Sequence, residues 1–252
     1  MSAHAAAAGV QQGALAGRVG LVNGAHGGLG AAASLACAQA GATVVLLGPK
    51  VPKLNRVYDA IARHGDGLPA PLNYPLDLEG AGADDYAEMA TRIESELGRL
   101  DGVLHCAADF PGLTPLEHTD PAAFARALHV NLTAKWWLTQ SCLPLLKRAA
   151  DSAVVFVVDD PGRVGKAYWG GYGIAQQGLS ALTAMLHAEL ANSPVRVSAL
   201  QPGPMRTSLR AKAYVNEEDI LARDPALSAG DCVTLLSAAG GLHRGSVWNP
   251  QA

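Results

Sequence analysis

The 252-residue sequence has no long hydrophobic run and no large excess of charge of one sign. Its longest strongly apolar runs, residues 43–47 and 153–158, fall far short of the ~20 residues that a membrane-spanning helix needs. With 19 Lys and Arg residues against 22 Asp and Glu, the formal net charge is -3, and a basic nucleic-acid-binding face is not expected. We therefore predict neither a membrane segment nor a nucleic-acid partner.

Paired-cysteine and metal-binding motifs are also missing. The four cysteines (Cys37, Cys106, Cys142 and Cys232) are far apart and form no CxxC pair, which predicts free thiols in a reducing compartment. The eight histidines form no HExxH motif and no cluster with cysteine, so no metal site is predicted. Residues 1–16 have neither the basic start nor the apolar stretch of a signal peptide. We interpret them as a flexible leader and expect a cytoplasmic protein.

The rest of the sequence is that of a folded chain, with 49% hydrophobic and 16% charged residues. Short apolar stretches alternate with longer helical ones, which predicts parallel strands joined by helical crossovers. The expected fold class is α/β: a single Rossmann-like doubly wound domain over residues 17–252, with a mostly parallel sheet of about seven strands and helices on both faces. Strands are predicted at residues 18–23, 43–47, 72–76, 102–106, 153–158, 195–200 and 246–249, and helices at 28–40, 51–64, 84–97, 121–149 and 169–191.

Two of the predicted helices carry polar residues of interest. Asp120-Pro121 is a helix-start signal, because it supplies an N-cap acceptor followed by proline at the first helical position. The helix that follows carries Asn131, and we expect a kink or break at Pro144. In the last predicted helix, Tyr172 and Gln176 are one turn apart and therefore project from the same face.

The first predicted strand runs into a glycine-rich turn at residues 23–30, Asn-Gly-Ala-His-Gly-Gly-Leu-Gly, which opens a helix. Gly24 permits the tight turn, Gly28 lets the backbone approach a pyrophosphate, and Gly30 allows close helix packing. Unpaired N–H groups at the helix N-terminus would bind the phosphates. We predict a dinucleotide site formed by Asn23, Gly24, His26, Gly28, Leu29 and Gly30, in which His26 either touches a phosphate or faces solvent.

The end of the second strand distinguishes the two nicotinamide dinucleotides. An acidic residue there would bind the ribose 2′-OH of NAD, whereas a basic residue suits the 2′-phosphate of NADP. Residues 46–50 contain no Asp or Glu, and Lys50 and Lys53 lie at and just beyond the end of the strand. NADP(H) is therefore favoured over NAD(H), unless both lysines are solvated surface residues or the site is vestigial and binds no nucleotide.

These features together resemble the short-chain dehydrogenase/reductase family over roughly residues 17–210. The family's glycine motif, Thr-Gly-x3-Gly-x-Gly, is matched except that Asn23 replaces Thr. Its Asn-Asn-Ala-Gly segment departs further, because residues 105–108 read His-Cys-Ala-Ala. The resemblance implies nucleotide contacts by Asp77, Leu78, Ala107, Pro202, Gly203 and Thr207.

The catalytic tetrad of that family is only half present. Asn131 and Tyr172 match its Asn and Tyr, but Asp159 stands where the family has Ser, with Asp160 as the alternative by one register. Gln176 stands where the family has Lys. In this family the tyrosine hydroxyl exchanges a proton with the substrate oxygen while hydride moves to or from the nicotinamide. The resemblance thus implies an NAD(P)-dependent oxidoreductase for a small carbonyl or alcohol substrate, with these replacements in its catalytic set.

Both replacements oppose the proton exchange. A free tyrosine has a pKa near ~10, and an ammonium about 4 Å away at an effective dielectric constant of about 20 would favour the phenolate by roughly 4 kcal/mol. Gln176 supplies no such charge, and an ionised Asp159 would raise the pKa of the phenol. We therefore predict a dinucleotide-binding homologue whose standard carbonyl–alcohol redox activity is lost or strongly impaired.

The first alternative is an active NADP(H)-dependent oxidoreductase with a non-standard site and an unidentified substrate. A protonated Asp159 would then act as the acid, or Lys135 or Lys166 would replace the missing lysine, although each is expected to be a solvated surface residue. The loops at residues 109–118 and 205–220 would hold the substrate, but their polar residues form no pattern that identifies a substrate class.

The second alternative is a non-enzymatic scaffold or partner subunit that uses the two long helices for assembly. Members of the resembled family form dimers or tetramers through these helices, so we expect a homodimer or homotetramer. Trp136 and Trp137 are candidates for that interface, because aromatic residues are enriched at interface hot spots.

Overall fold

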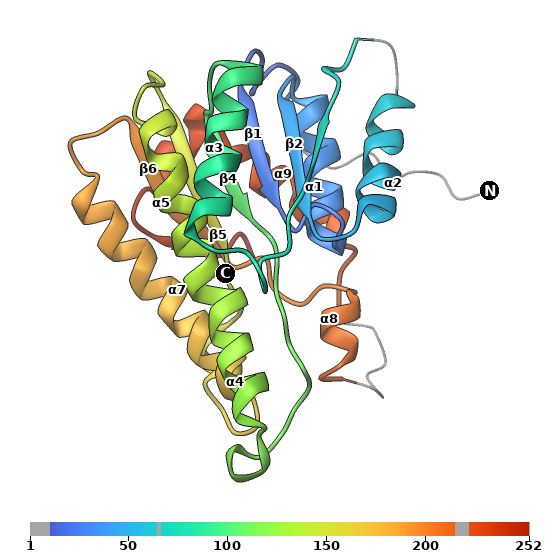
Figure 1. Cartoon of the computed structure of the whole chain (residues 1–252), viewed down its shortest axis with the longest axis vertical. Helices are drawn as coiled ribbons and strands as arrows, with labels where there is room; N and C mark the ends of the chain where they lie inside the picture. The colour runs from blue at the N-terminus through green and yellow to red at the C-terminus, as the bar shows by residue number, and fades with distance from the viewer. Residues whose placement is uncertain (1–10, 65–66, 215–221, 252) are drawn as a thin grey trace.

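The structure of the protein, a computed structural model, describes residues 11–64, 67–214 and 222–251 (Figure 1). Within them, strands form one parallel sheet in the order β3-β2-β1-β4-β5-β6-β7. The doubly wound α/β prediction is confirmed, and each strand agrees with its predicted range to within one residue at either end. The strands are β1 (Val19–Asn23), β2 (Thr43–Gly48), β3 (Leu72–Pro75), β4 (Gly102–His105), β5 (Ser152–Val157), β6 (Val195–Leu200) and β7 (Val247–Trp248).

Helices cover both faces of the sheet (Figure 1). One face is packed by α1 (Gly28–Gln39), α2 (Val51–Ala62) and α9 (Ala229–Leu236), and the other by α3 (Ala83–Leu97), α5 (Ala134–Leu146) and α7 (Gly170–Glu189). Short helical segments complete the described chain: α4 (Pro121–Leu128), α6 (Pro161–Val164), α8 (Ser208–Ala211), and the 3-10 turns Leu116–His118, Pro225–Ser228 and Ala238–His243. The sequence did not predict α6, α8 or α9, because elements of four to eight residues are too short to show a helical period.

The predicted helix over residues 121–149 is interrupted, at a different place from the one expected. Asp120 does cap its start, accepting from the Ala123 N–H at 2.8 Å. The regular helix stops after α4, and a π-helical turn, His129–Thr133, leads into α5, which continues through Pro144 to Leu146. In this turn the Asn131 side chain donates to the Ala127 carbonyl at 2.7 Å, an acceptor that a regular α-helix would give to the Asn131 N–H.

The N-terminal boundary lies earlier than the sequence suggested. Leu15 is buried, and its N–H donates to the Ala40 carbonyl at 2.9 Å, so the packed chain begins before residue 17. Residues 1–10 of the predicted leader, and residues 215–220 of the predicted substrate loop, lie outside the described part of the chain.

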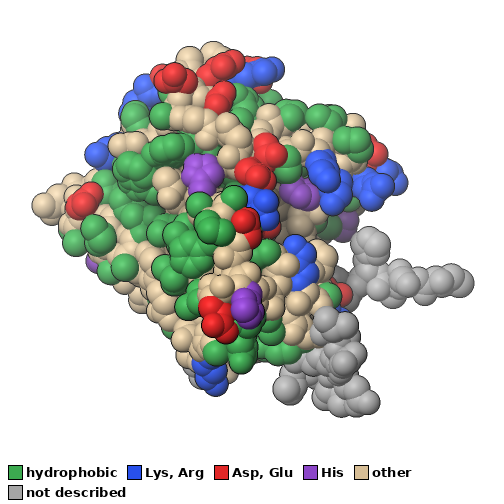
Figure 2. Space-filling view, turned by 60° about the horizontal axis from the view of Figure 1, so that its bottom comes forward, with side chains coloured by type: hydrophobic (Ala, Val, Ile, Leu, Met, Phe, Trp, Pro, Cys, Tyr) green, Lys and Arg blue, Asp and Glu red, His purple; other side chains and the backbone are tan. Residues whose placement is uncertain are grey.

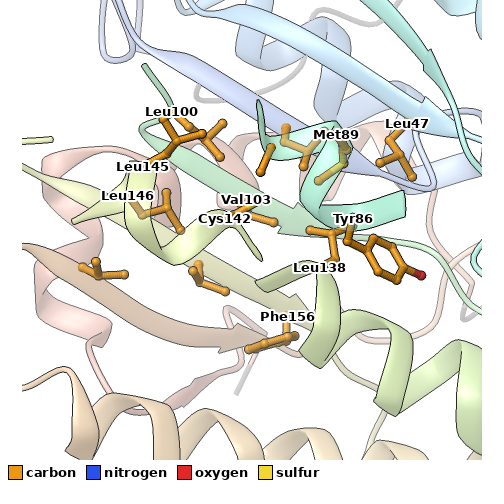
Figure 3. Close-up of a cluster of buried hydrophobic side chains, with 14 of the residues drawn as sticks. Leu47, Tyr86, Met89, Leu100, Val103, Leu138, Cys142, Leu145, Leu146 and Phe156 are labelled. Carbon is orange, nitrogen blue, oxygen red and sulfur yellow. The ribbon is translucent and has the colours of Figure 1, made fainter. Parts of the chain in front are cut away.

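The apolar core on the α3, α5 and α7 side holds the site-bearing strands β4 and β5 in place (Figure 3). Met89 from α3, Leu138 from α5 and Phe156 from β5 are fully buried in it. None of the helices in the described ranges is both long and apolar enough to cross a bilayer. Basic and acidic side chains are interspersed on the face shown in Figure 2, rather than segregated by sign.

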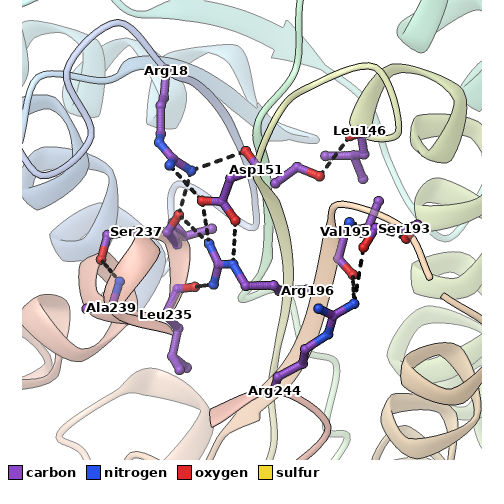
Figure 4. A network of polar contacts seen from close by, with 12 residues as sticks. Arg18, Leu146, Asp151, Ser193, Val195, Arg196, Leu235, Ser237, Ala239 and Arg244 are labelled. Atoms are coloured by element: carbon purple, nitrogen blue, oxygen red, sulfur yellow. Dashed lines mark hydrogen bonds and ion pairs between the residues drawn. The ribbon is translucent and has the colours of Figure 1, made fainter. Parts of the chain in front are cut away.

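A partly buried polar network holds the amino end of the sheet (Figure 4). Asp151, just before β5, accepts from Arg196 of β6 at 2.7 Å and from Arg18 at 2.7 Å. Arg196 also donates to the Leu235 carbonyl of α9 at 3.0 Å. Although partial burial acts in the opposite direction, the hydrogen bonds from Arg196 and Arg18 hold the pKa of Asp151 below its usual value. The network therefore ties two strands and α9 together through one carboxylate.

We predict that Asp151→Asn lowers the free energy of unfolding by about 1–3 kcal/mol, because the mostly buried Arg196 loses its charged partner. Urea denaturation measures this. The stabilisation is present above the ordinary carboxyl pKa and is lost as the pH falls through the lowered value. Asp59→Asn, which removes an exposed ion pair with Arg63, is the control and should cost less than about 0.5 kcal/mol. Equal losses in the two variants would contradict the prediction.

Candidate functional site

A cleft of about 430 Å³ opens at the carboxyl ends of the strands, around the point where the strand order reverses between β1 and β4. In doubly wound sheets this is where ligands bind. Of the residues predicted for the site, Lys50 and Asn131 do not line the cleft. The others do: Asn23, Gly24, His26, Gly28, Leu29, Gly30, Asp77, Leu78, Ala107, Asp159, Tyr172, Gln176, Pro202, Gly203 and Thr207.

The glycine-rich turn is shaped as a phosphate cradle. Gly24 has φ +76°, and a methyl group on it would lie 2.5 Å from the Ala107 nitrogen. A methyl group on Gly30 would overlap the Gly24 carbonyl, so α1 packs against the turn more closely than any side chain allows. Gly27 and Gly28 at the start of α1 are exposed, which leaves the helix N-terminus open to an anion. These residues fit the pyrophosphate of a dinucleotide.

The part of the cleft beyond the cradle, toward β2 and β3, carries positive charge. His26 is half-buried, and its Nδ1 is buried without a hydrogen-bond partner. Burial lowers the pKa of His26, and the positive charges of Lys53 and Lys50 lower it further. Lys53 lines the cleft itself, whereas Lys50 acts from its edge. Asp77, exposed and in the same half of the cleft, accepts from the Glu79 N–H at 3.1 Å.

The opposite half of the cleft holds the candidate catalytic residues. The Tyr172 hydroxyl of α7 donates to Asp159 Oδ2 at 3.1 Å. One turn along, Gln176 is turned toward the end of β5, where its Oε1 accepts from the Asp159 N–H at 3.0 Å. Asp159, and not Asp160, is thus the residue beside the phenol, since the Asp160 side chain caps α6 by accepting from the Gly162 N–H at 2.9 Å.

Sequence reasoning missed the partner of Asp159. The Arg163 guanidinium of α6 forms an ion pair with Asp159 Oδ1, donates to the Tyr214 hydroxyl at 3.3 Å and stacks 5.5 Å from the centre of the Trp169 ring. An ion pair with a guanidinium is the arrangement of a carboxylate, not of a protonated acid. One sequence signal could have revealed this pair. Asp160-Pro161 is a helix-start signal, and the short helix that it begins puts Arg163 within reach of the end of β5.

These contacts decide the state of the phenol. Burial raises the pKa of Tyr172 well above its usual value, and the Asp159 charge and hydrogen bond raise it further, whereas Arg163 lowers it. The hydroxyl proton is directed at a carboxylate, and the residue at the position of the missing lysine is a neutral amide. The arrangement favours a protonated phenol whose hydrogen bond is already taken by Asp159.

Asn131 lies behind the cleft rather than in its wall. It is fully buried, accepts from the Asp109 N–H at 3.0 Å and donates to the Asp109 carbonyl at 2.7 Å. These two bonds hold the segment after β4 against the π turn. Asp109 directly follows Ala107 and Ala108, which line the cleft, so Asn131 contacts the cleft wall only through this neighbouring residue.

The expectation that Lys135 is a surface residue is wrong. Its side chain is 1% exposed on α5, and burial lowers its pKa to about 8. The helix has apolar residues on all sides, so the sequence period did not reveal which face packs inward. Lys166 is exposed and does not line the cleft.

We predict that Asp159→Ser lowers the pKa of Tyr172, because it removes the carboxylate that binds the phenol proton while leaving the burial in place. Tyrosinate absorbance during a pH titration measures this, with Tyr172→Phe identifying the signal. Asp160→Ser is the matched control, since serine also caps helices, and it should leave the pKa of Tyr172 unchanged. An identical titration of wild type and Asp159→Ser would refute the assignment.

Comparison with known proteins identifies the family of the chain. Residues 18–218 match the family model described as short chain dehydrogenase. The chain is 34% identical to the uncharacterized oxidoreductase YciK of Escherichia coli strain K12, over 83% of this chain and 82% of that protein.

Among solved structures, a protein of Pseudomonas syringae assigned to the short chain dehydrogenases superimposes with a TM-score of 0.91 at 40% identity, covering 96% of this chain and 97% of that one. A protein of Escherichia coli CFT073, solved in complex with NADPH, gives 0.90 at 32% identity, covering 96% and 100%. The fold, the glycine cradle and the matched residues together identify this chain as a member of the short-chain dehydrogenase/reductase family of oxidoreductases.

Proposed function

We propose that this protein binds NADP(H) and that its standard carbonyl–alcohol redox step is lost or strongly impaired. One observation carries the proposal: the Tyr172 hydroxyl donates its hydrogen bond to Asp159, which is itself paired with Arg163. In the family, that hydroxyl exchanges its proton with the substrate oxygen. A nicotinamide dinucleotide, when bound, would supply hydride to a carbonyl or accept it from an alcohol, and the chain must correspondingly supply or accept the proton.

The proton step is opposed in two ways. A substrate oxygen would have to compete with the Asp159 carboxylate for the phenol hydrogen bond, and charge-assisted hydrogen bonds are the stronger kind. Negative charge developing on that oxygen would lie beside the carboxylate. Gln176 offers an amide and no positive charge to offset this. Since general acid–base catalysis contributes about 10²–10⁴-fold to rates, its loss alone would leave a very slow enzyme.

The preference for NADP(H) rests on the charge near the end of β2. Lys53 lines the cleft, Lys50 is close enough to act on His26, and the buried Nδ1 of His26 has no partner. A 2′-phosphate would complement these groups, whereas the 2′-hydroxyl of NAD would leave them uncompensated. The relative from Escherichia coli CFT073 that was solved with NADPH supports the same choice.

We predict that Lys53→Ala weakens NADPH binding by about tenfold or more, the usual effect of removing a charged hydrogen-bond donor, and leaves NADH binding unchanged. Fluorescence titration with both nucleotides measures this. Lys166→Ala, at an exposed position outside the cleft, serves as the control. Equal weakening of NADPH and NADH binding would count against a 2′-phosphate contact.

For catalysis, we predict that Asp159→Ser combined with Gln176→Lys raises NADPH-dependent reduction of simple ketones and aldehydes by at least about 100-fold over wild type. Serine can donate to a carbonyl oxygen, and the lysine restores a positive charge beneath the phenol. Arg163 also contacts Tyr214 and Trp169, and neither substitution removes those partners. The two single substitutions are the matched controls, and each should recover less activity than the pair.

Wild-type turnover already at the level of the double variant would favour the active, non-standard enzyme instead. Absence of binding by either nucleotide would favour the scaffold. Exposed apolar side chains on the outer helices, Trp136 of α5 and Ile174 and Met185 of α7, support the expected homodimer or homotetramer. The four free cysteines support a reducing compartment, and the cytoplasm is the location we propose.

A further inference from the structure

One stripe of polar residues on the π turn and α5 faces the segment that follows β4. Asn131 bonds to the backbone of Asp109, and Thr139, two helical turns further on, lies 2.9 Å from the Nε2 of His105. Lys135 is between them, four residues from each. It therefore stands in register with the middle of the segment, where Cys106, Ala107 and Ala108 form a wall of the cleft.

The Lys135 side chain is almost entirely buried and has no ionic partner among the described residues. Its side chain is 1% exposed, and within the described ranges it makes no hydrogen bond or ion pair to a side chain or carbonyl. Besides burial, the group that acts on its pKa is Cys106, whose own thiol pKa burial raises to about 12. Lys135 in turn acts on His105, whose pKa burial holds well below its usual value. Neither neighbour carries charge at neutral pH. An unpaired buried charge costs stability, so its retention points to a use.

The wall in front of Lys135 belongs to the nicotinamide half of the cleft. A dinucleotide lies across the reversal point, with its adenosine on the β2–β3 side and its nicotinamide on the β4–β5 side. Ala107 and Ala108 follow β4, and Tyr172, Asp159 and Gln176 lie in the same half. A positive charge behind this wall acts on whatever occupies that half, across apolar atoms that screen it weakly.

We propose that Lys135 is an electrostatic positioning residue, which supplies positive charge behind the nicotinamide half of the cleft and thereby favours reduced over oxidised nucleotide. The proposal rests on the nucleotide binding proposed above. The oxidised nicotinamide ring carries a positive charge that the reduced ring lacks, so the ammonium repels only the oxidised form. This charge does not replace the family's lysine at the phenol, because the pKa of Tyr172 is set by burial, Asp159 and Arg163, and Lys135 is not among the groups that act on it.

The test is the ratio of the dissociation constants of NADP⁺ and NADPH, measured by titration of the full chain. Lys135→Met should lower this ratio by about tenfold, the scale of a partly screened interaction between two charges. Lys135→Arg, which keeps the charge, should retain the wild-type ratio. Lys147→Met, at an exposed position just after α5, is the matched control and should also retain it.

A pH series on wild type provides a second measurement that needs no Lys135→Met protein. Because burial lowers the pKa of Lys135 to about 8, its charge is lost as the pH rises through that value, and the ratio should fall toward that of Lys135→Met. Lys135→Arg should show no such fall. His105 and Cys106 do not change charge between pH 7 and pH 10, since their pKa values lie on either side of that range.

The outcomes separate this inference from the function on which it rests. If both nucleotides bind and neither Lys135→Met nor high pH changes the ratio, the role of Lys135 is overturned and NADP(H) binding stands. If neither nucleotide binds, the proposed function falls and this inference falls with it. A lowered ratio in Lys147→Met as well would show a nonspecific charge effect and would also overturn the inference.

Discussion

The catalytic end of the molecule is organised around the Asp159 carboxylate. It takes a hydrogen bond from Tyr172 of α7 and an ion pair from Arg163 of α6, while its own N–H donates to Gln176. Arg163 in turn reaches Tyr214, just beyond α8. The Asp159 side chain therefore connects α6 with α7 on the rim of the cleft, and Arg163 extends the contact to the segment after α8. The same contacts that order this rim engage the phenol that the family uses for proton exchange.

Nucleotide binding and proton transfer make separable demands on this fold. The cradle depends on backbone geometry: Gly24 and Gly30 permit an approach of strand, turn and helix that no side chain would allow. Proton transfer depends on a few charges near one hydroxyl. Relative to the family, Asp159 adds a negative charge there and Gln176 lacks the positive one. A chain can thus keep the whole sheet and its cleft while the charges around Tyr172 change, because neither Asp159 nor Gln176 supports the apolar core.

Two buried charged groups show opposite solutions to the cost of desolvation. Arg196 is paired with Asp151 and with carbonyls of α9, so its charge contributes to holding the sheet together. Lys135 has only neutral neighbours, His105 and Cys106, and its lowered pKa records the cost of burying it. In a protein interior the first arrangement is explained by stability. Stability does not explain the buried Lys135, and its place behind the wall of the cleft is the basis for the electrostatic role proposed above.

The sequence alone determined the sheet and most of the cleft, because those features are encoded locally. Buried parallel strands appear as short apolar runs, the cradle as glycines at fixed spacing, and the shared face of Tyr172 and Gln176 as a four-residue interval. The tertiary structure alone decided the pairing of Asp159 with Arg163, the interruption at Asn131 and the burial of Lys135. These depend on which helix face meets the sheet and on where a chain turns after a strand. Since α5 buries the polar Lys135 and Thr139 and exposes Trp136, its pattern of apolar residues does not predict that orientation, and packing against β4 and β5 sets it.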